Sequence, residues 1–227
     1  MKGILVTGTD TGVGKTYVAC LLGRRLVGEG IGVYPLKPVE SGCLPGPDGK
    51  PFPADAAALR DAIAPRLPLP AACLYPLSAP SSPHLAARRE GVSIDPGRIR
   101  KMVLDAGEVS EIVLVEGAGG IAVEICEGYA FSDLARDLSL PVLVVAENRL
   151  GVLNHLRLTL RYLQSEGLIL AGVVLNDRTG EPSPSRETNE AEIRRIAGDR
   201  FLGRVPFGAA SLPEEAFLRF RDICLTA

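Results

Sequence analysis

The most constraining feature of the sequence is a glycine- and threonine-rich turn that directly follows a short apolar run. The turn is GTDTGVGKTY at residues 8–17, and the apolar run before it extends from Ile4 to Val6. Its end matches the phosphate-loop pattern G-x-x-x-x-G-K-[ST], although Thr9 stands in place of the first glycine and Gly8 lies one residue earlier. A strand before such a turn and a helix after it allow backbone N–H groups to bind an anion. The stretch therefore predicts a variant nucleotide-binding loop.

Further apolar runs alternate with helical patterns along the rest of the chain. They lie at residues 33–36, 112–115, 142–145, 170–175 and 201–205. Because these runs are continuous and rich in β-branched residues, they predict parallel strands that are buried on both faces. Pro35 interrupts the first of them, which indicates an edge position or an early strand end. The sequence thus predicts an α/β fold, a doubly wound and mainly parallel sheet flanked by helices as in phosphate-loop NTPases, with ligands beyond the carboxyl ends of the strands.

Two segments have clear helical patterns. In residues 15–30, apolar side chains recur every four residues from Val18, and the pattern ends at Gly28. In residues 152–167, four leucines form one apolar stripe opposite polar and basic side chains. No repeat or change of pattern divides the chain, so residues 1–227 are expected to form one domain.

Two stretches fall outside these patterns. Residues 65–84 are rich in proline and form either a stiff extended connection or part of a site. Residues 45–52, PGPDGKPF, are typical of a surface turn.

Composition narrows the possible partners and the compartment. Hydrophobic residues make up 46% and charged residues 23% of the chain, which is typical of globular proteins. With 25 basic and 27 acidic side chains the net charge is −2, so neither nucleic acid nor an anionic membrane is an expected partner. The five cysteines form no C-x-x-C pair, and we find no signal peptide and no apolar run near the roughly 18 residues of a membrane helix. We therefore expect a cytoplasmic protein with reduced thiols and small-molecule partners.

The loop and a later acidic residue together indicate a Mg²⁺–nucleotide site. Lys15 is placed to reach the β- and γ-phosphates of a nucleotide, and the Thr16 hydroxyl is suited to bind Mg²⁺. Glu116 follows an apolar strand and precedes a glycine-rich stretch, where packing gives no reason for a carboxylate. Asp55 precedes an alanine-rich helix and, by itself, is more often a helix N-cap than a ligand.

A second ligand is expected near Lys37. This lysine ends a predicted strand, and it precedes a stiff turn in which Ser41 offers a hydroxyl. A lysine at a strand end is usually a solvated charge. The residues alone predict Mg²⁺ and ATP with a second ligand, but they do not identify that ligand.

Taken together, these segments resemble the dethiobiotin synthetases, ATP-dependent enzymes that close the ureido ring in biotin biosynthesis. The resemblance covers most of the chain and keeps the order of the family's motifs. The matching stretches are VTGTDTGVGKT at 6–16, KPVESG at 37–42, AD at 54–55, SSPH at 81–84, VEGAGG at 115–120, LGVLNH at 150–155, ND at 176–177 and VPF at 205–207.

The resemblance implies a role for each matching position. Thr16, Asp55 and Glu116 would hold Mg²⁺, and Lys15 and Lys37 would flank the γ-phosphate and the reacting carbamate. The implied catalytic residues are Lys37, Lys15, Thr11 and Ser41. The implied ATP-binding residues are Gly12, Val13, Gly14, Lys15, Thr16, Tyr17, Asp55, Glu116, Gly117, Ala118, Gly119, Asn176, Asp177, Pro206 and Phe207. The implied substrate-binding residues are Thr11, Lys37, Ser41, Ser82, Gly151, Val152, Leu153 and Asn154.

The resemblance also implies a reaction and an assembly. CO₂ adds to one amine of diaminopelargonic acid, the carbamate attacks the γ-phosphate of ATP, and the second amine closes the ring and expels phosphate. Two subunits form a homodimer in which the acid tail of the substrate reaches the partner at residues 151–154. His84 would lie near the substrate or be a buried, hydrogen-bonded histidine, and His155 is expected on a helix surface. Gly12 stands where many relatives carry glutamate, so this position supplies no carboxylate contact.

Two other classes of function remain open at this point. Switch ATPases of the partitioning or septum-positioning kind have similar loops, but they usually carry a second lysine inside the loop. Residues 9–13 of this chain contain no lysine. A binding module in which the glycine-rich turns only hold a ligand is the third possibility.

Overall fold

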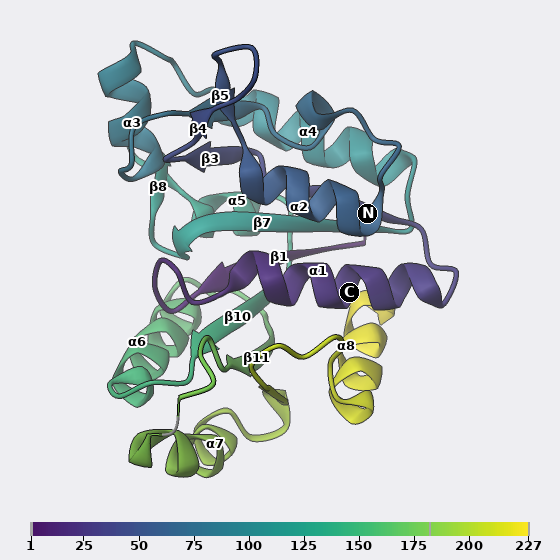
Figure 1. Ribbon diagram of the computed structural model, residues 1–227, viewed down its shortest axis with the longest axis vertical. Coiled ribbons are helices and arrows are strands. Elements are labelled where there is room, and N and C mark those ends of the chain that lie inside the picture. The colour runs from purple at the N-terminus through teal and green to yellow at the C-terminus, as the bar shows by residue number, and fades with distance from the viewer. Residues whose placement is uncertain (1, 182, 227) are drawn as a thin grey trace.

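A parallel sheet in the order β12-β11-β10-β1-β7-β2 forms the centre of the molecule (Figure 1). The structure is a computed structural model that describes residues 2–181 and 183–226. The strands are β1 (Gly3–Gly8), β2 (Val33–Leu36), β7 (Ile112–Gly120), β10 (Val142–Glu147), β11 (Leu170–Asn176) and β12 (Phe201–Val205). Every pairing between neighbours is parallel, and β2, which contains Pro35, lies at an edge. The structure therefore confirms all the predicted strands and the edge position.

Helices cover both faces of this sheet (Figure 1). On one face, α1 (Lys15–Gly28), α2 (Ala54–Ile63) and α8 (Glu214–Thr226) share a hydrophobic cluster with Ile4 and Val6 of β1. On the other face, the helices are α3 (Pro83–Glu90), α4 (Pro96–Glu108), α5 (Phe131–Asp137), α6 (Val152–Ser165) and α7 (Pro184–Ala197). Leu5 of β1 packs in their cluster. Successive residues of β1 thus enter opposite cores, as expected for a strand that is buried on both faces.

The two predicted helical patterns are confirmed. The first forms α1, which ends at Gly28 as expected. The second forms α6, whose Leu156 and Leu163 are buried while Arg157 and Arg161 on the other side are exposed. No helix in residues 2–181 and 183–226 has the length and apolar character needed to cross a membrane.

Short strands extend the fold on the side of β2. β3 (Val39–Ser41) pairs in parallel with β6 (Tyr75–Leu77). The hairpin β4 (Leu44–Pro45) and β5 (Pro51–Phe52) contains the predicted surface turn. The remaining short elements are the hairpin β8 (Glu124–Cys126) and β9 (Tyr129–Ala130) and the 3-10 helices η1 (Leu69–Ala71) and η2 (Gly198–Arg200). The proline-rich stretch at 65–84 is thus more than an extended connection, because it supplies η1, β6 and the start of α3.

Candidate active site

The glycine-rich turn between β1 and α1 has a backbone conformation that requires glycine at two positions. Gly12 and Gly14 have φ of 77° and 91°, in the left-handed region that favours glycine. A Cβ at Gly14 would lie 2.2 Å from the side-chain nitrogen of Asn176, so the turn also packs too closely for any side chain. Gly14 occupies the N-cap position of α1 and supplies no side-chain cap. The amino end of α1 is therefore free of a capping side chain, as an anion site requires.

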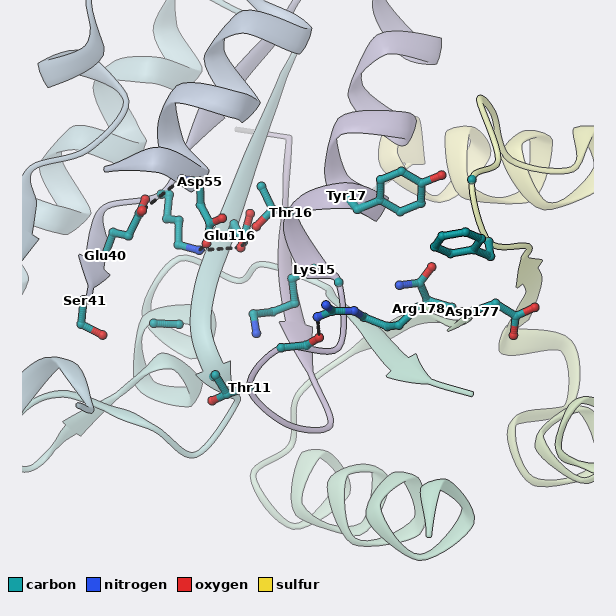
Figure 2. A pocket seen from close by; sticks show the side chains of 18 residues that line it. Thr11, Lys15, Thr16, Tyr17, Glu40, Ser41, Asp55, Glu116, Asp177 and Arg178 are labelled. Carbon is teal, nitrogen blue, oxygen red and sulfur yellow. Dashed lines mark hydrogen bonds and ion pairs between the residues drawn. The ribbon is translucent and has the colours of Figure 1, made fainter. Parts of the chain in front are cut away.

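A cavity of about 500 Å³ opens beside this turn, at the carboxyl ends of β1, β7 and β11 (Figure 2). Its size is within the usual range for a small-molecule site. Its lining comes from the loop, from residues after β2, from the start of α2, and from β7, β11 and the segment after β12. The lining residues are Thr11, Gly12, Gly14, Lys15, Thr16, Tyr17, Lys37, Glu40, Ser41, Asp55, Glu116, Ala118, Gly119, Asn176, Asp177, Arg178, Phe207 and Gly208.

Lys37 is a buried residue of the cavity lining and lies between two carboxylates. Its Nζ is 2.5 Å from Oδ2 of Asp55 and 2.7 Å from Oε1 of Glu116. Glu116 is fully buried, and its Oε1 also accepts a hydrogen bond of 2.8 Å from the Thr16 hydroxyl. Burial disfavours the ammonium form of Lys37, but the charges of Glu116 and Asp55 outweigh this effect and raise the pKa of Lys37. Lys37 is therefore a buried cation that stays charged at neutral pH, and not a solvated surface lysine.

Asp55 does not cap a helix. The N-cap position of α2 is Pro53, and Asp55 is the second residue of the helix itself. Its carboxylate contacts Lys37, which brings it beside Thr16 and Glu116 (Figure 2). The helix-cap interpretation of Asp55 is therefore wrong.

Lys15 is the second buried cation of the cavity. Its Nζ lies 3.4 Å from the carbonyl oxygen of Asp10, and the residue is only 6% exposed. Burial lowers the pKa of Lys15, and the charge of Lys37 lowers it further, against the opposing effect of the carboxylates. An anion bound in the loop would compensate both positive charges.

The oxygen atoms in this part of the cavity fit a magnesium ion. Oε2 of Glu116 is buried and has no hydrogen-bond partner, so it is an acceptor without a donor. Thr16 and Asp55 add hard oxygen atoms beside it, which are the ligands that Mg²⁺ prefers. Within the described ranges no group of three or more His, Cys, Asp or Glu could hold a metal alone. A cation here would therefore depend on further oxygen ligands, such as those of phosphate groups.

The opposite side of the cavity is built from β11 and the segments after β11 and β12. The Asn176 side chain donates from Nδ2 to the carbonyl of Val13 at 2.9 Å, and its buried Oδ1 has no partner. Asp177 accepts from Asn148 at 2.7 Å and from Arg204 at 2.8 Å, one bond on each carboxylate oxygen. Phe207 is 61% exposed at the rim. This side offers an unpaired amide acceptor and an aromatic surface, as a nucleobase site would.

Several residues implied by the resemblance lie outside the lining of this cavity. Val13 belongs to the loop but is buried, and a Cβ at Gly117 would lie 3.4 Å from the Phe131 ring. Pro206 lines a neighbouring cavity with Arg204, directly before Phe207 at the rim of the main cavity, and its place in the base pocket stays a prediction.

Five further residues expected to bind the substrate, four of them at its acid tail, are not part of the cavity lining. Ser82 is the N-cap residue of α3, and Gly151, Val152, Leu153 and Asn154 form the start of α6. His84 is partly buried, and its Nε2 lies 3.5 Å from a Glu124 oxygen.

Glu40 and Arg178 line the cavity but were not singled out from the sequence. Glu40 lies in the KPVESG stretch between Lys37 and Ser41, the two residues of this stretch that were predicted as site residues. Arg178 directly follows the ND pair and donates a hydrogen bond to the carbonyl of Gly12. A basic residue beside a predicted nucleotide-binding pair was the signal that could have identified Arg178.

The chain is similar to known proteins over almost its whole length. Residues 2–215 match a protein family described as an AAA domain. The chain is 41% identical to an ATP-dependent dethiobiotin synthetase of Anaeromyxobacter sp. (strain Fw109-5), over 97% of both chains. It is 39% identical to an ATP-dependent dethiobiotin synthetase of Anoxybacillus flavithermus, over 86% of both chains.

Solved structures share the fold at much lower identity. A putative plasmid partition protein of Borrelia burgdorferi bound to AMPPNP matches with a TM-score of 0.55 and 11% identity, over 99% of this chain and 98% of the other. A ParA family ATPase of Chlorobium tepidum matches with a TM-score of 0.53 and 18% identity, over 100% of this chain and 93% of the other. These matches confirm the predicted phosphate-loop NTPase fold. They support the switch ATPase alternative at the level of the fold only.

Proposed function

The chain belongs to the dethiobiotin synthetase family, and from this premise we propose that it closes the ureido ring of dethiobiotin from diaminopelargonic acid, CO₂ and ATP. The observation that carries the proposal is the position of Lys37, a buried cation between two carboxylates in the same cavity as the phosphate loop. Such a cation can stabilise negative charge on a phosphoryl group and on a carbamate at once.

ATP binds across the cavity. Lys15 and the amino end of α1 bind the β- and γ-phosphates, because both present positive charge without a competing side-chain cap. The free Oδ1 of Asn176 accepts a hydrogen bond from the adenine amino group. Asp177 holds the base site in place through Asn148 and Arg204, which donate hydrogen bonds to its two oxygens.

Thr16, Asp55 and Glu116 would hold Mg²⁺, together with oxygen atoms of the phosphates. When bound, the ion supplies charge neutralisation for phosphoryl transfer. The unpaired Oε2 of Glu116 supports this assignment, because a buried carboxylate oxygen without a donor is costly unless a ligand satisfies it.

The reaction proceeds by three bond exchanges. One neutral amine of the substrate attacks CO₂ and loses a proton, which gives a carbamate. A carbamate oxygen attacks the γ-phosphorus, the bond to the β-phosphate oxygen breaks, and ADP leaves. The second amine attacks the carbonyl carbon and loses a proton, the carbon–oxygen bond to the phosphate breaks, and phosphate leaves as the ring closes. Lys37 and Lys15 stabilise the charge on the transferred phosphoryl group, and Thr11 and Ser41 orient the diamine from the cavity wall.

The protein works as a homodimer in which residues 151–154 bind the acid tail of a substrate held by the partner. The amino end of α6 has no side-chain cap at Gly151, which suits a carboxylate. Leu150 and Leu158 are 82% and 62% exposed beside it, and burial of such side chains favours association. Sedimentation over a range of protein concentrations tests this assembly, and a monomer at micromolar concentration would contradict it.

We propose a single catalytic domain, because strands from the first and last parts of the chain join one sheet. All five cysteines are free thiols, which suits a reducing cytoplasm. The partners are small molecules, and neither nucleic acid nor membrane takes part.

The decisive experiment supplies the purified protein with ATP, Mg²⁺, bicarbonate and diaminopelargonic acid, and detects dethiobiotin by mass spectrometry. We expect one ADP and one phosphate for each dethiobiotin. If the rate of ATP hydrolysis does not depend on the diamine but increases with DNA or with lipid vesicles, the proposal is contradicted and a switch ATPase is favoured.

A further inference from the structure

We infer that Glu40 is a positioning residue, which fixes the amino end of α2 and thereby holds the Asp55 carboxylate in place beside Lys37. The inference rests on the proposed function, because it concerns the residues that would bind Mg²⁺. Figure 2 shows the Glu40 side chain directed at the start of the helix that carries Asp55.

The Glu40 carboxylate takes the place of a helix cap. Its Oε1 accepts from the backbone N–H of Asp55 at 3.0 Å, and its Oε2 accepts from the N–H of Ala56 at 2.9 Å. The N-cap residue itself is Pro53, which has no side-chain acceptor. A carboxylate at this end of a helix also interacts favourably with the helix dipole. One side chain from β3 thus satisfies two donors of the first turn of α2.

Burial makes these two bonds necessary. Glu40 is 6% exposed, and a buried carboxylate is costly unless hydrogen bonds compensate the loss of water. Both of its oxygens are compensated by the α2 amides. The carboxylate is therefore locked to the helix and does not move freely in the cavity.

Residues 37–40 contact both the side chain and the backbone of Asp55. Lys37 contacts the carboxylate of Asp55 at 2.5 Å, and Glu40, three residues later, binds the backbone N–H of Asp55. Lys37 also joins this unit to Glu116. If Glu40 is lost, the helix end keeps no side-chain acceptor and Asp55 can shift against Thr16 and Glu116. Loss of a residue that orients a metal ligand commonly weakens metal binding about 10- to 100-fold.

The test compares Glu40→Ala with Glu40→Gln and with a matched control, Asp95→Ala. Asp95 caps α4, because its side chain accepts a hydrogen bond of 2.7 Å from the Gly97 N–H. Its loss therefore also removes a helix cap, but Asp95 does not line the cavity. Mn²⁺ replaces Mg²⁺ as the probe, and the loss of its free-ion EPR signal measures binding in the presence of a non-hydrolysable ATP analogue. Binding of the analogue in EDTA and thermal unfolding are measured in parallel.

We expect Glu40→Ala to weaken Mn²⁺ binding at least about tenfold, while analogue binding in EDTA changes less than about twofold. Glu40→Gln should fall between Glu40→Ala and the wild type, because its amide has one acceptor oxygen for two N–H donors. Asp95→Ala should bind Mn²⁺ like the wild type.

Equal Mn²⁺ affinity in the wild type and Glu40→Gln, or equal losses in Glu40→Ala and Asp95→Ala, would overturn the inference. If Glu40→Ala does not fold, Glu40→Gln alone decides. The proposed function is judged separately, by dethiobiotin formation in the wild type.

Discussion

The two sides of the cavity are built in different ways. On the side of β7 and α2, Lys37, Asp55, Glu116 and Thr16 form one connected group, in which Lys37 is 4% and Glu116 0% exposed. On the side of β11, one buried amide lies near Phe207, which is 61% exposed. The first side is a connected set of buried charges, as a reacting centre needs, and the second combines an unpaired amide oxygen with an exposed ring. Substitutions should therefore affect turnover on the first side and binding or selectivity on the second.

The largest effect is expected for Lys37→Ala. Loss of the charge that we propose to stabilise the transferred phosphoryl group should lower kcat by about 10²-fold or more, with nearly unchanged affinity for the nucleotide. Turnover and binding of a fluorescent ATP analogue measure the two effects. Lys101→Ala is the control, because it removes an exposed surface pair with Asp105. Full activity of Lys37→Ala would contradict its role.

Glu116→Gln should have the next largest effect. The substitution removes a carboxylate charge, so the Mg²⁺ concentration for half-maximal activity should rise roughly 10- to 100-fold. It also removes one of the two charges that raise the pKa of Lys37, so that pKa should fall relative to the wild type, although Asp55 still raises it. Lys37 would lose its proton as pH rises, and the variant should lose activity at a lower alkaline pH than the wild type. If kcat of Glu116→Gln and of the wild type falls at the same alkaline pH, the proposed effect of Glu116 on the pKa of Lys37 is refuted.

Asn176→Ala should reduce selectivity among nucleotides. The variant loses the amide that would accept from adenine, and a hydrogen bond of about 1.4 kcal/mol corresponds to about tenfold in discrimination between ATP and other nucleoside triphosphates. Competition among ATP, GTP and CTP measures this ratio, with kcat for ATP as a control. Unchanged selectivity would remove Asn176 from the base site.

The smallest effect is expected for Phe207→Ala. The ring is exposed and contributes an aromatic face to the rim, so its loss should raise KM for ATP about 3- to 10-fold without changing kcat. Steady-state kinetics at saturating substrate separates the two constants. A large fall in kcat would mean that the two sides of the cavity are not independent.

The sheet could be predicted from the sequence because its signals are local. Continuous apolar runs identified every strand of the sheet, and Pro35 identified the edge. The apolar spacing that predicts α1 and α6 and the glycines that predict the loop are likewise signals within short segments of the sequence.

The site was predictable only in part, because its contacts join distant segments. No local pattern is a physical reason to place Lys37 against Glu116, which lies 79 residues later. Asp55 matched an N-cap pattern, but Glu40 performs the capping in its place, and a cap supplied by another strand leaves no local signal. The same reasoning explains why Glu40 was missed.

The central claim is that a carbamate oxygen, and not water, attacks the γ-phosphate beside Lys37. Oxygen-18 tests it most directly. The enzyme is given ¹⁸O-labelled CO₂ in unlabelled water, for a time shorter than oxygen exchange between CO₂ and water, and the released phosphate is analysed by mass spectrometry. The account predicts one ¹⁸O atom in each phosphate formed with dethiobiotin. Phosphate that carries no label would contradict it, because the γ-phosphoryl group would then have been transferred to water and not to the carbamate.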